Sequence, residues 1–533
     1  MRKNNPFRWL RNVFAKAVFR YKTDNGDASD GCGCSRLALL FFTVYSSVVI
    51  ILSFPANGIG IPPFPAVMLA VAVPAVVFVA GSHAARLFSA SGVYCDRRMM
   101  SPMKVFFSVF VIYASLVVFN RFDTPDTTWQ WGQAVGERPL DDWHPLIHTF
   151  LVFLPTVVVK SGWFVVVAQS FAFAALVAWT YSALMKYGYN GRAVAIVLII
   201  SVFNPFSMAM ACVLWKDTAF AYTGLALTVC LVHIVETDGD WLTGKKAVGV
   251  AALLFLASFV RHNGFFYTLP LALFLPFSVG AKNVAKTLVC IGLAAALSIV
   301  YVWGRNAAIA RGTVENGSPH QRFSESVGLP MCMMAHCYVT HPEKSSPELE
   351  RLFSGFGGRK FVEAKYVGSY NSFKFPLIES GGDPGKIIHE FGHDEFVRLF
   401  FETVKTDPSS AAESVLHVTS QAWSPVPDGQ EVYGYGDVGW YQRALSILPG
   451  GSLIRAPGFH MLCLVFAFCV AFGRIGRKAF VFAAPLFCYQ FGTMLFLSGD
   501  DYRFFYISVL TAGVCCLALL RRRAAPRLRE CGR

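Results

Sequence analysis

Long apolar stretches, separated by short polar links, run along most of the chain. They have about the 17 to 25 residues that an α-helix needs to cross the hydrocarbon core of a bilayer. They lack the alternation and turn spacing of a β-barrel, so we expect every span to be a helix. The pattern predicts an all-α polytopic membrane protein with about twelve transmembrane helices. The expected spans are 37–54, 64–81, 105–120, 163–185, 193–214, 218–235, 247–260, 264–280, 287–303, 460–473, 479–497 and 504–520.

The links between these spans form two sets that alternate along the chain. Every member of one set holds lysine or arginine: 86–104, 186–192, 236–246, 282–286 and 474–478. Because short cytoplasmic links are enriched in basic residues, this set and both ends of the chain are predicted to face the cytoplasm. The other set is predicted to face outward.

Composition agrees with a membrane location. Hydrophobic residues make up 54% of the chain and charged residues 15%, with a mean hydropathy of +0.47, whereas about a quarter of the residues in a soluble domain are charged. The net charge of +14 has its basic clusters in a leader (1–36) and a tail (521–533). Basic clusters at these two positions fit cytoplasmic segments that contact anionic lipid. They do not indicate nucleic-acid binding. No cleavable signal peptide is expected, because the first apolar run follows a long basic leader and lacks a small-residue cleavage pattern.

The outward loop 121–162 holds many ionisable and aromatic residues, although charged residues are scarce in the chain as a whole. Its acidic residues, histidines and tryptophans are Asp123, Asp126, Asp141, Asp142, His144, His148, Trp129, Trp131 and Trp143. Residues 145–160 are apolar but interrupted by proline, which predicts an interfacial helix or a short re-entrant piece.

Three outward links of only a few residues carry basic residues, although lysine and arginine are expected mainly in the short cytoplasmic links. These are Lys216, Arg261 and Arg503. A cation on the outer side of a short link indicates an anionic ligand. The alternative is that these are helix-end charges, neutralised locally by Asp217 or Asp501.

The pattern divides the chain into segments. Residues 37–304 are interpreted as a transmembrane catalytic core and 460–520 as C-terminal transmembrane helices. The polar stretch 305–459 between them is long enough for a small folded domain and is predicted to be an extracytoplasmic insertion. Cys332 and Cys337 lie in that insertion, where oxidising conditions would allow them to pair.

The outward motifs together resemble the GT-C superfamily of lipid-linked-sugar glycosyltransferases. The stretches that carry the resemblance are PDTTWQW, DDWHPLIHT, WKD, RHNG and DDYRFFY, within 105–280 and again near residue 500. Most of the resemblance rests on the order of these motifs and on the side of the membrane that they are predicted to face. The resemblance implies transfer of a sugar from a polyprenyl-phosphate or polyprenyl-pyrophosphate donor to a glycan, lipid or protein acceptor outside the membrane.

The resemblance also implies roles for single residues. Asp126 matches the general base of the first loop, and Asp123 is its near rival. Asp142 and His144 would orient the base or the acceptor. Donor phosphate would be bound by Lys216, Arg261, His262 and Arg503, and substrate by Asp141, Trp129, Trp143, Asp217 and Asp501. The tryptophans fit an interfacial belt equally well. Asp126 is followed by Thr127 instead of a second acid, so a divalent-metal requirement stays open.

A second motif, His389-Glu390-Phe391-Gly392-His393, matches the H-E-x-x-H pattern of zinc hydrolases. In that alternative His389 and His393 bind zinc and Glu413 is the third ligand. It leaves the acidic loop and the basic outward links unexplained.

Two other protein classes are alternatives to these. A transporter would place charges within the spans, which are nearly free of them. A polysaccharide polymerase or ligase stays open as a chemically related alternative.

Overall fold

The computed structural model describes residues 44, 124–202, 204–317, 319–425, 451–497 and 501–521. Within these residues the regular structure is helical, and the only β pairing is an isolated bridge between Asp141 and Glu315. The chain is therefore an all-α membrane protein in the part described. The predicted leader, the first three predicted spans except residue 44, Asp123 and the tail beyond residue 521 lie outside the described residues.

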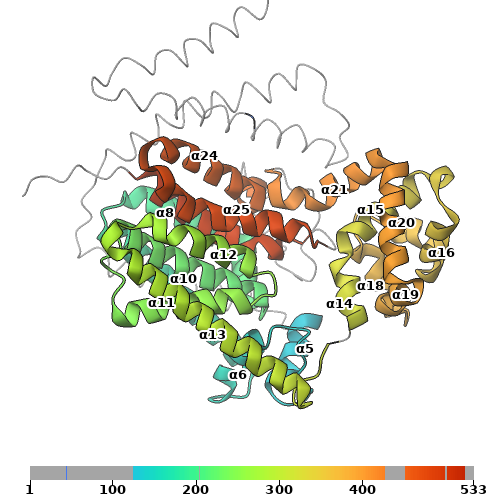
Figure 1. Cartoon of the computed structure of the whole chain (residues 1–533), viewed down its shortest axis with the longest axis horizontal. Helices are drawn as coiled ribbons and strands as arrows, with labels where there is room; N and C mark the ends of the chain where they lie inside the picture. The colour runs from blue at the N-terminus through green and yellow to red at the C-terminus, as the bar shows by residue number, and fades with distance from the viewer. Residues whose placement is uncertain are drawn as a thin grey trace, which may run out of the picture.

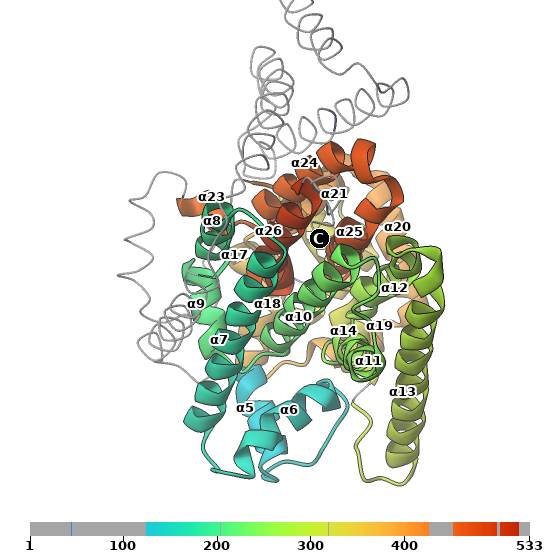
Figure 2. The same cartoon turned by 90° about the vertical axis from the view of Figure 1, so that its left-hand side faces the viewer.

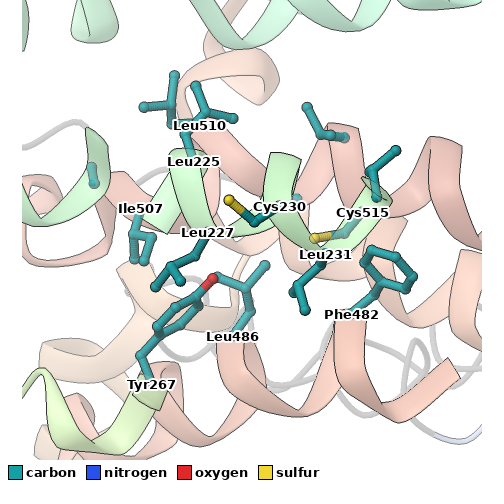
Figure 3. Packing of buried hydrophobic residues seen from close by; sticks show 14 of the residues in the cluster. Leu225, Leu227, Cys230, Leu231, Tyr267, Phe482, Leu486, Ile507, Leu510 and Cys515 are labelled. Atoms are coloured by element: carbon teal, nitrogen blue, oxygen red, sulfur yellow. The ribbon is translucent and has the colours of Figure 1, made fainter. Parts of the chain in front are cut away.

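The membrane part is a bundle built around one central helix, α10 (Lys216–Glu236), which is buried along almost its whole length. Leu225, Leu227 and Leu231 of α10 pack against α25 (Phe480–Met494), α26 (Tyr506–Leu520) and Tyr267 of α12 (Phe265–Phe274) (Figure 3). The other bundle helices are α7 (Gly162–Lys186), α8 (Gly191–Val202), α9 (Pro205–Cys212), α11 (Gly244–Phe259), α13 (Val284–Ala310) and α24 (Pro457–Ile475). Short 3-10 turns, η2 (Leu275–Ser278), η3 (Ala281–Asn283) and η5 (Gly476–Ala479), join several of them.

Five described helical segments are long and apolar enough to cross a membrane, or six if the bent pair α8 and α9 counts as one span. One of the five, Pro457–Met494, contains both α24 and α25. The predicted spans 247–260 and 264–280 form shorter helices, α11 and α12. The predicted span 193–214 is broken because Asn204 caps α9 and Pro205 begins it. The number twelve stays a prediction.

The described links of the set grouped as cytoplasmic, 186–192, 236–246, 282–286 and 474–478, meet at one end of the bundle, and the link 86–104 lies outside the described residues. At that end Glu236 pairs with Arg521 and accepts a hydrogen bond from Tyr189. The Lys478 ammonium lies 2.8 Å from Asp238. Lys216 and Glu236 begin and end α10, whose 21 residues span about 30 Å at 1.5 Å per residue. The outward motifs therefore lie at the opposite end of the bundle.

A second helical body lies beside the bundle (Figure 1, yellow to orange). Its helices are α14 (Pro319–Ser326), α15 (Gly328–Thr340), η4 (Pro342–Lys344), α16 (Pro347–Gly355), α17 (Gly358–Lys365), α18 (Asn371–Glu379), α19 (Pro384–Phe391), α20 (His393–Thr406) and α21 (Pro408–Trp423). It has its own apolar core, which also takes in Leu497 and Phe505 from the bundle. The predicted insertion thus contains a folded domain, although its first residues extend helix α13.

Two further contacts attach this domain to the bundle. The Gln490 amide of α25 donates a 2.6 Å hydrogen bond to the carbonyl of Ala422, and Ser508 of α26 donates to the Gln490 oxygen. At Gly458 a Cβ atom would lie 2.3 Å from the Ser424 carbonyl, so only glycine allows α24 to approach α21 this closely. Cys332 and Cys337, predicted as a possible pair, are both buried in α15 and are not joined by a disulfide in this structure.

Helices α5 (Pro125–Ala134) and α6 (Leu146–Thr156) lie below the bundle, beside the lower ends of α7 and α11 (Figure 2). Helix α6 has 11 residues, too few to cross a bilayer. It buries His148, Thr149 and Val152 and exposes Phe150 and Phe153. This is the arrangement of an interfacial helix, as the sequence predicts.

Candidate functional site

The site is built on Asp126, which bridges two cations from distant parts of the chain. Its Oδ2 atom lies 3.3 Å from the Lys216 ammonium and 3.2 Å from the Arg503 guanidinium. All three side chains are partly exposed, at 29%, 18% and 20% respectively. We call Asp126, Lys216 and Arg503 the ion cluster. The structure therefore brings together the predicted base and two of the predicted phosphate ligands.

Helix ends hold the ion cluster in place. Thr124 caps α5, with its hydroxyl accepting from the backbone of Thr127, so Asp126 falls in the first turn. The same hydroxyl accepts a 2.8 Å hydrogen bond from the indole of Trp215, the residue before α10. Asp126 and Lys216 thus occupy the first turns of two helices that this bond ties together.

Arg503 is fixed from two sides. It lies in η6 (Tyr502–Phe505), and its Nε is 2.7 Å from Asp501. Its guanidinium also stacks 4.7 Å from the centre of the Trp215 ring. Asp501 caps η6 and orients Arg503, and its predicted contact with substrate stays a prediction.

The electrostatics of the ion cluster keep Asp126 ionised. Burial alone raises its pKa, but Lys216, Arg503 and His144 together hold the pKa well below the ordinary value for aspartate. A carboxylate paired in this way is charged at every physiological pH, and it is a weak base while both cations engage it.

A second ion pair, with both side chains buried, includes Asp217, which is the residue after Lys216 of the ion cluster. Arg261, at the end of α11, pairs with Asp217 of α10. The same guanidinium nitrogen donates to the Tyr489 hydroxyl at 2.6 Å and to the Phe504 carbonyl at 3.1 Å. In this structure Arg261 and Asp217 therefore lock α10, α11, α25 and η6 together. Their predicted contacts with phosphate and substrate stay predictions.

Asp141 and Asp142 organise the loop between α5 and α6. Asp141 accepts 3.0 Å hydrogen bonds from the Trp129 indole and from the backbone of Trp143. Asp142 accepts from the backbone of Gly317 and pairs with Arg322. Both carboxylates are thus committed to protein partners.

The segment that follows α13 is tied to this loop, which the sequence did not indicate. The Glu315 backbone N–H donates to Leu140 at 2.7 Å and its carbonyl accepts from Asp142 at 3.2 Å. With Arg322 and Gly317 these contacts connect the extramembrane domain to the site. The only local signal in the sequence is that Arg322 is a basic residue in a segment predicted to face outward. This signal does not identify Asp142 as its partner.

Three histidines lie close to the ion cluster. His144 and His148 are 4% and 2% exposed, and the Nδ1 atom of each has no hydrogen-bond partner among the described residues. His262 makes a 2.9 Å hydrogen bond with the Trp143 carbonyl. Burial first, and then the charge on Lys216, lowers the pKa of His144 to about 3. Burial also lowers the pKa of His262. His144 is therefore neutral at physiological pH.

A cavity of about 190 Å³ opens beside these histidines. We call it the α6–α13 cavity, after the helices at its edges. It is lined by Asp142, His144, Pro145, Leu146, Ser258, Phe259, Arg261, His262, Phe265, Tyr301 and Arg305. The ion cluster is not part of this lining.

The two predicted tryptophans stand at the edge of the site. Trp129 is 41% exposed and has the Arg138 guanidinium 4.3 Å above its ring. Trp143 contributes backbone atoms to the bonds with Asp141 and His262. Neither ring lines the α6–α13 cavity.

The alternative zinc motif does not form a continuous helix. Helix α19 ends at Phe391, Gly392 has φ of 100°, and His393 begins α20. His393 stacks on Phe323, and Glu413 lies 3.6 Å from His336. Asp383 caps α19 by accepting from the backbone N–H groups of Gly385 and Lys386. No group of three or more His, Cys, Asp or Glu side chains suited to a metal occurs in the described part of the chain.

The arrangement offers an ionised carboxylate, two cations and a neutral imidazole at one end of a membrane bundle. Comparison of the chain with protein-family models, with curated proteins and with solved structures finds no match.

Proposed function

We propose that the chain is a membrane glycosyltransferase of the GT-C type. It moves a sugar from a polyprenyl-phosphate-type donor to an acceptor on the extracytoplasmic side of the cell membrane. The observation that carries the proposal is the ion cluster, in which Asp126 lies between Lys216 and Arg503 at one end of the bundle. This end also carries the interfacial helix α6, where a lipid-linked donor would arrive.

The chemistry needs a base and an anion site in one place. The acceptor hydroxyl attacks the anomeric carbon, and the bond from that carbon to the phosphate oxygen breaks. The electron pair leaves on the phosphate, whose charge Lys216 and Arg503 stabilise. The hydroxyl proton goes to the Asp126 carboxylate.

Donor binding would also activate the base. In the structure Lys216 and Arg503 engage Asp126 and so depress its pKa, after allowing for the opposing effect of burial. A donor phosphate shares the same two cations, which weakens their hold on Asp126. Its basicity then rises when substrate is present.

The experiment follows the lipid-linked sugar pool in cells. Cells producing the chain are compared with cells producing Asp126→Asn, and extracted polyprenyl-linked sugars are quantified by mass spectrometry. We expect one such lipid to accumulate about tenfold or more in the variant, because a general base contributes roughly 10²–10⁴-fold to rate. Asp240→Asn, at the opposite end of the bundle, is the matched control. Identical pools in all three strains would count against the proposal.

A further inference from the structure

The ion cluster does not line the α6–α13 cavity, so the proposed sugar transfer leaves this cavity without a role. Its polar wall carries Arg305, which donates to the amide oxygen of Asn306 and has no carboxylate partner among the described residues. Asp142 is the one acidic residue of the lining, and it is already paired with Arg322. The cavity therefore has an excess of positive charge and favours an anionic group.

The opposite wall of the cavity is apolar. Leu146, Phe259 and Phe265 form it, and Phe265 is 48% exposed. From there the apolar surface continues along α12 through Leu269 and Leu273, which are also exposed. These are outer faces of a membrane bundle, so the cavity is continuous with a lipid-facing surface.

His144 connects the α6–α13 cavity with the ion cluster. It lines the cavity, and it is also close enough to Asp126 and Lys216 for their charges to affect its pKa. Its Nδ1 atom is buried without a partner among the described residues. A buried nitrogen without a hydrogen bond is energetically unfavourable, and a hydroxyl from a ligand would remove that cost.

We propose that the α6–α13 cavity binds a membrane amphiphile with an anionic, hydroxyl-bearing headgroup, whose alkyl chain lies along the outer face of α12. In the transferase this amphiphile is the acceptor, with its hydroxyl on His144 and turned towards Asp126. The acceptor role rests on the proposed function, whereas the binding does not. The acceptor is then a membrane lipid and not a soluble glycan.

Binding is tested with dodecyl phosphate as the probe. The purified chain in detergent micelles is titrated by calorimetry, with empty micelles subtracted and inorganic phosphate as the comparison ligand. We expect dodecyl phosphate to bind at least about tenfold more tightly than inorganic phosphate, because the apolar wall contributes. Arg305→Ala should weaken dodecyl phosphate binding by about tenfold.

Matched controls make the result specific to the cavity. Arg311→Ala removes the same charge from the exposed C-terminal end of α13 and should leave binding unchanged. Leu146→Trp fills the cavity and should weaken binding without changing any charge. Equal affinity for the two phosphates, or unchanged binding in both Arg305→Ala and Leu146→Trp, would overturn the proposal.

The two proposals fail in different ways. Sugar transfer to a water-soluble glycan, without Arg305-dependent binding of dodecyl phosphate, would overturn the lipid acceptor and leave the transferase standing. Arg305-dependent binding, without release of polyprenyl phosphate for any lipid acceptor, would remove the transferase and leave the amphiphile site.

Discussion

At the scale of single residues, the ion cluster uses one carboxylate for two purposes. Asp126 neutralises Lys216 and Arg503 in the resting protein. It occupies the place that the anionic group of a ligand would take, so it competes with that ligand. Asp126 is thus both the proposed base and an internal occupant of the anion site.

Replacing Asp126 should therefore strengthen anion binding while it abolishes transfer. Asp126→Asn removes the competing charge and keeps the shape, so inorganic pyrophosphate should bind about tenfold more tightly. Lys216→Ala should weaken the same binding. Calorimetric titration of the purified variants checks both. Weaker binding in Asp126→Asn would show that the carboxylate does not compete for the cations.

His144 makes a separate contribution to the pH dependence of stability. Its pKa falls from 6.5 to about 3 on folding, so the unfolded chain binds more protons between these values. Stability should then rise with pH through this window, and at pH 5 the folded state loses about 2 kcal/mol relative to pH 7. Above about pH 7.5 the histidine contributes almost no slope, because it is then neutral in the unfolded chain as well.

The corresponding variant is His144→Gln, which cannot titrate. Its free energy of unfolding should change less between pH 7 and pH 5 than that of the parent chain, by about 2 kcal/mol. Thermal unfolding in detergent at the two pH values measures this difference. An identical pH dependence in both chains would contradict the assignment of a buried neutral imidazole.

At the scale of the elements, the site depends on helix ends meeting. Three described helices begin at a capping residue followed by proline, namely Thr124-Pro125, Asn204-Pro205 and Asp383-Pro384. The sequence predicts the interfacial character of α6. The bend between α8 and α9 was missed, since the apolar pattern continues through it.

The ion pair between Arg261 and Asp217 is the strongest link between elements that the site requires. Both side chains are buried, at 7% and 1% exposed. Arg261→Ala leaves Asp217 without its cation, which should destabilise the bundle by about 3 to 5 kcal/mol. Tyr489→Phe loses the two hydrogen bonds of the hydroxyl, one accepted from Arg261 and one donated to the Phe504 carbonyl, and should cost about 2 kcal/mol. Thermal unfolding of the two variants checks this order, and equal effects would show that the ion pair does not hold the elements together.

At the scale of the whole molecule, alternation of charge along the chain predicted which links lie together. The contacts of Glu236 with Tyr189 and Arg521, and of Asp238 with Lys478, bring described links of that set together, and their cytoplasmic side stays a prediction. Periodicity cannot give the pairing of Asp142 with Arg322 or of Arg261 with Asp217, because each joins residues from distant links. Sidedness placed Asp126 and the four predicted phosphate ligands on one side of the membrane, and two of those ligands, Lys216 and Arg503, are in contact with Asp126.

The proposed orientation is tested by labelling from outside. Single cysteines replace the exposed residues Glu137, at the site end, and Lys245, at the opposite end. An impermeant maleimide added to intact cells should label Glu137→Cys and spare Lys245→Cys, with the parent chain as background. Labelling of Lys245→Cys alone would reverse the topology, and labelling of both from outside would contradict a membrane-spanning bundle.

The most direct measurement of the central claim is release of polyprenyl phosphate by the purified chain in lipid nanodiscs. The chain is supplied with a panel of polyprenyl-phosphate sugars and a membrane lipid extract, and the free carrier is quantified by mass spectrometry. We predict release from one donor, with a loss of about 10²–10⁴-fold in Asp126→Asn and full activity in Asp240→Asn. Full release by Asp126→Asn together with loss in Asp123→Asn would move the base to Asp123. Full release by both variants would contradict a carboxylate mechanism.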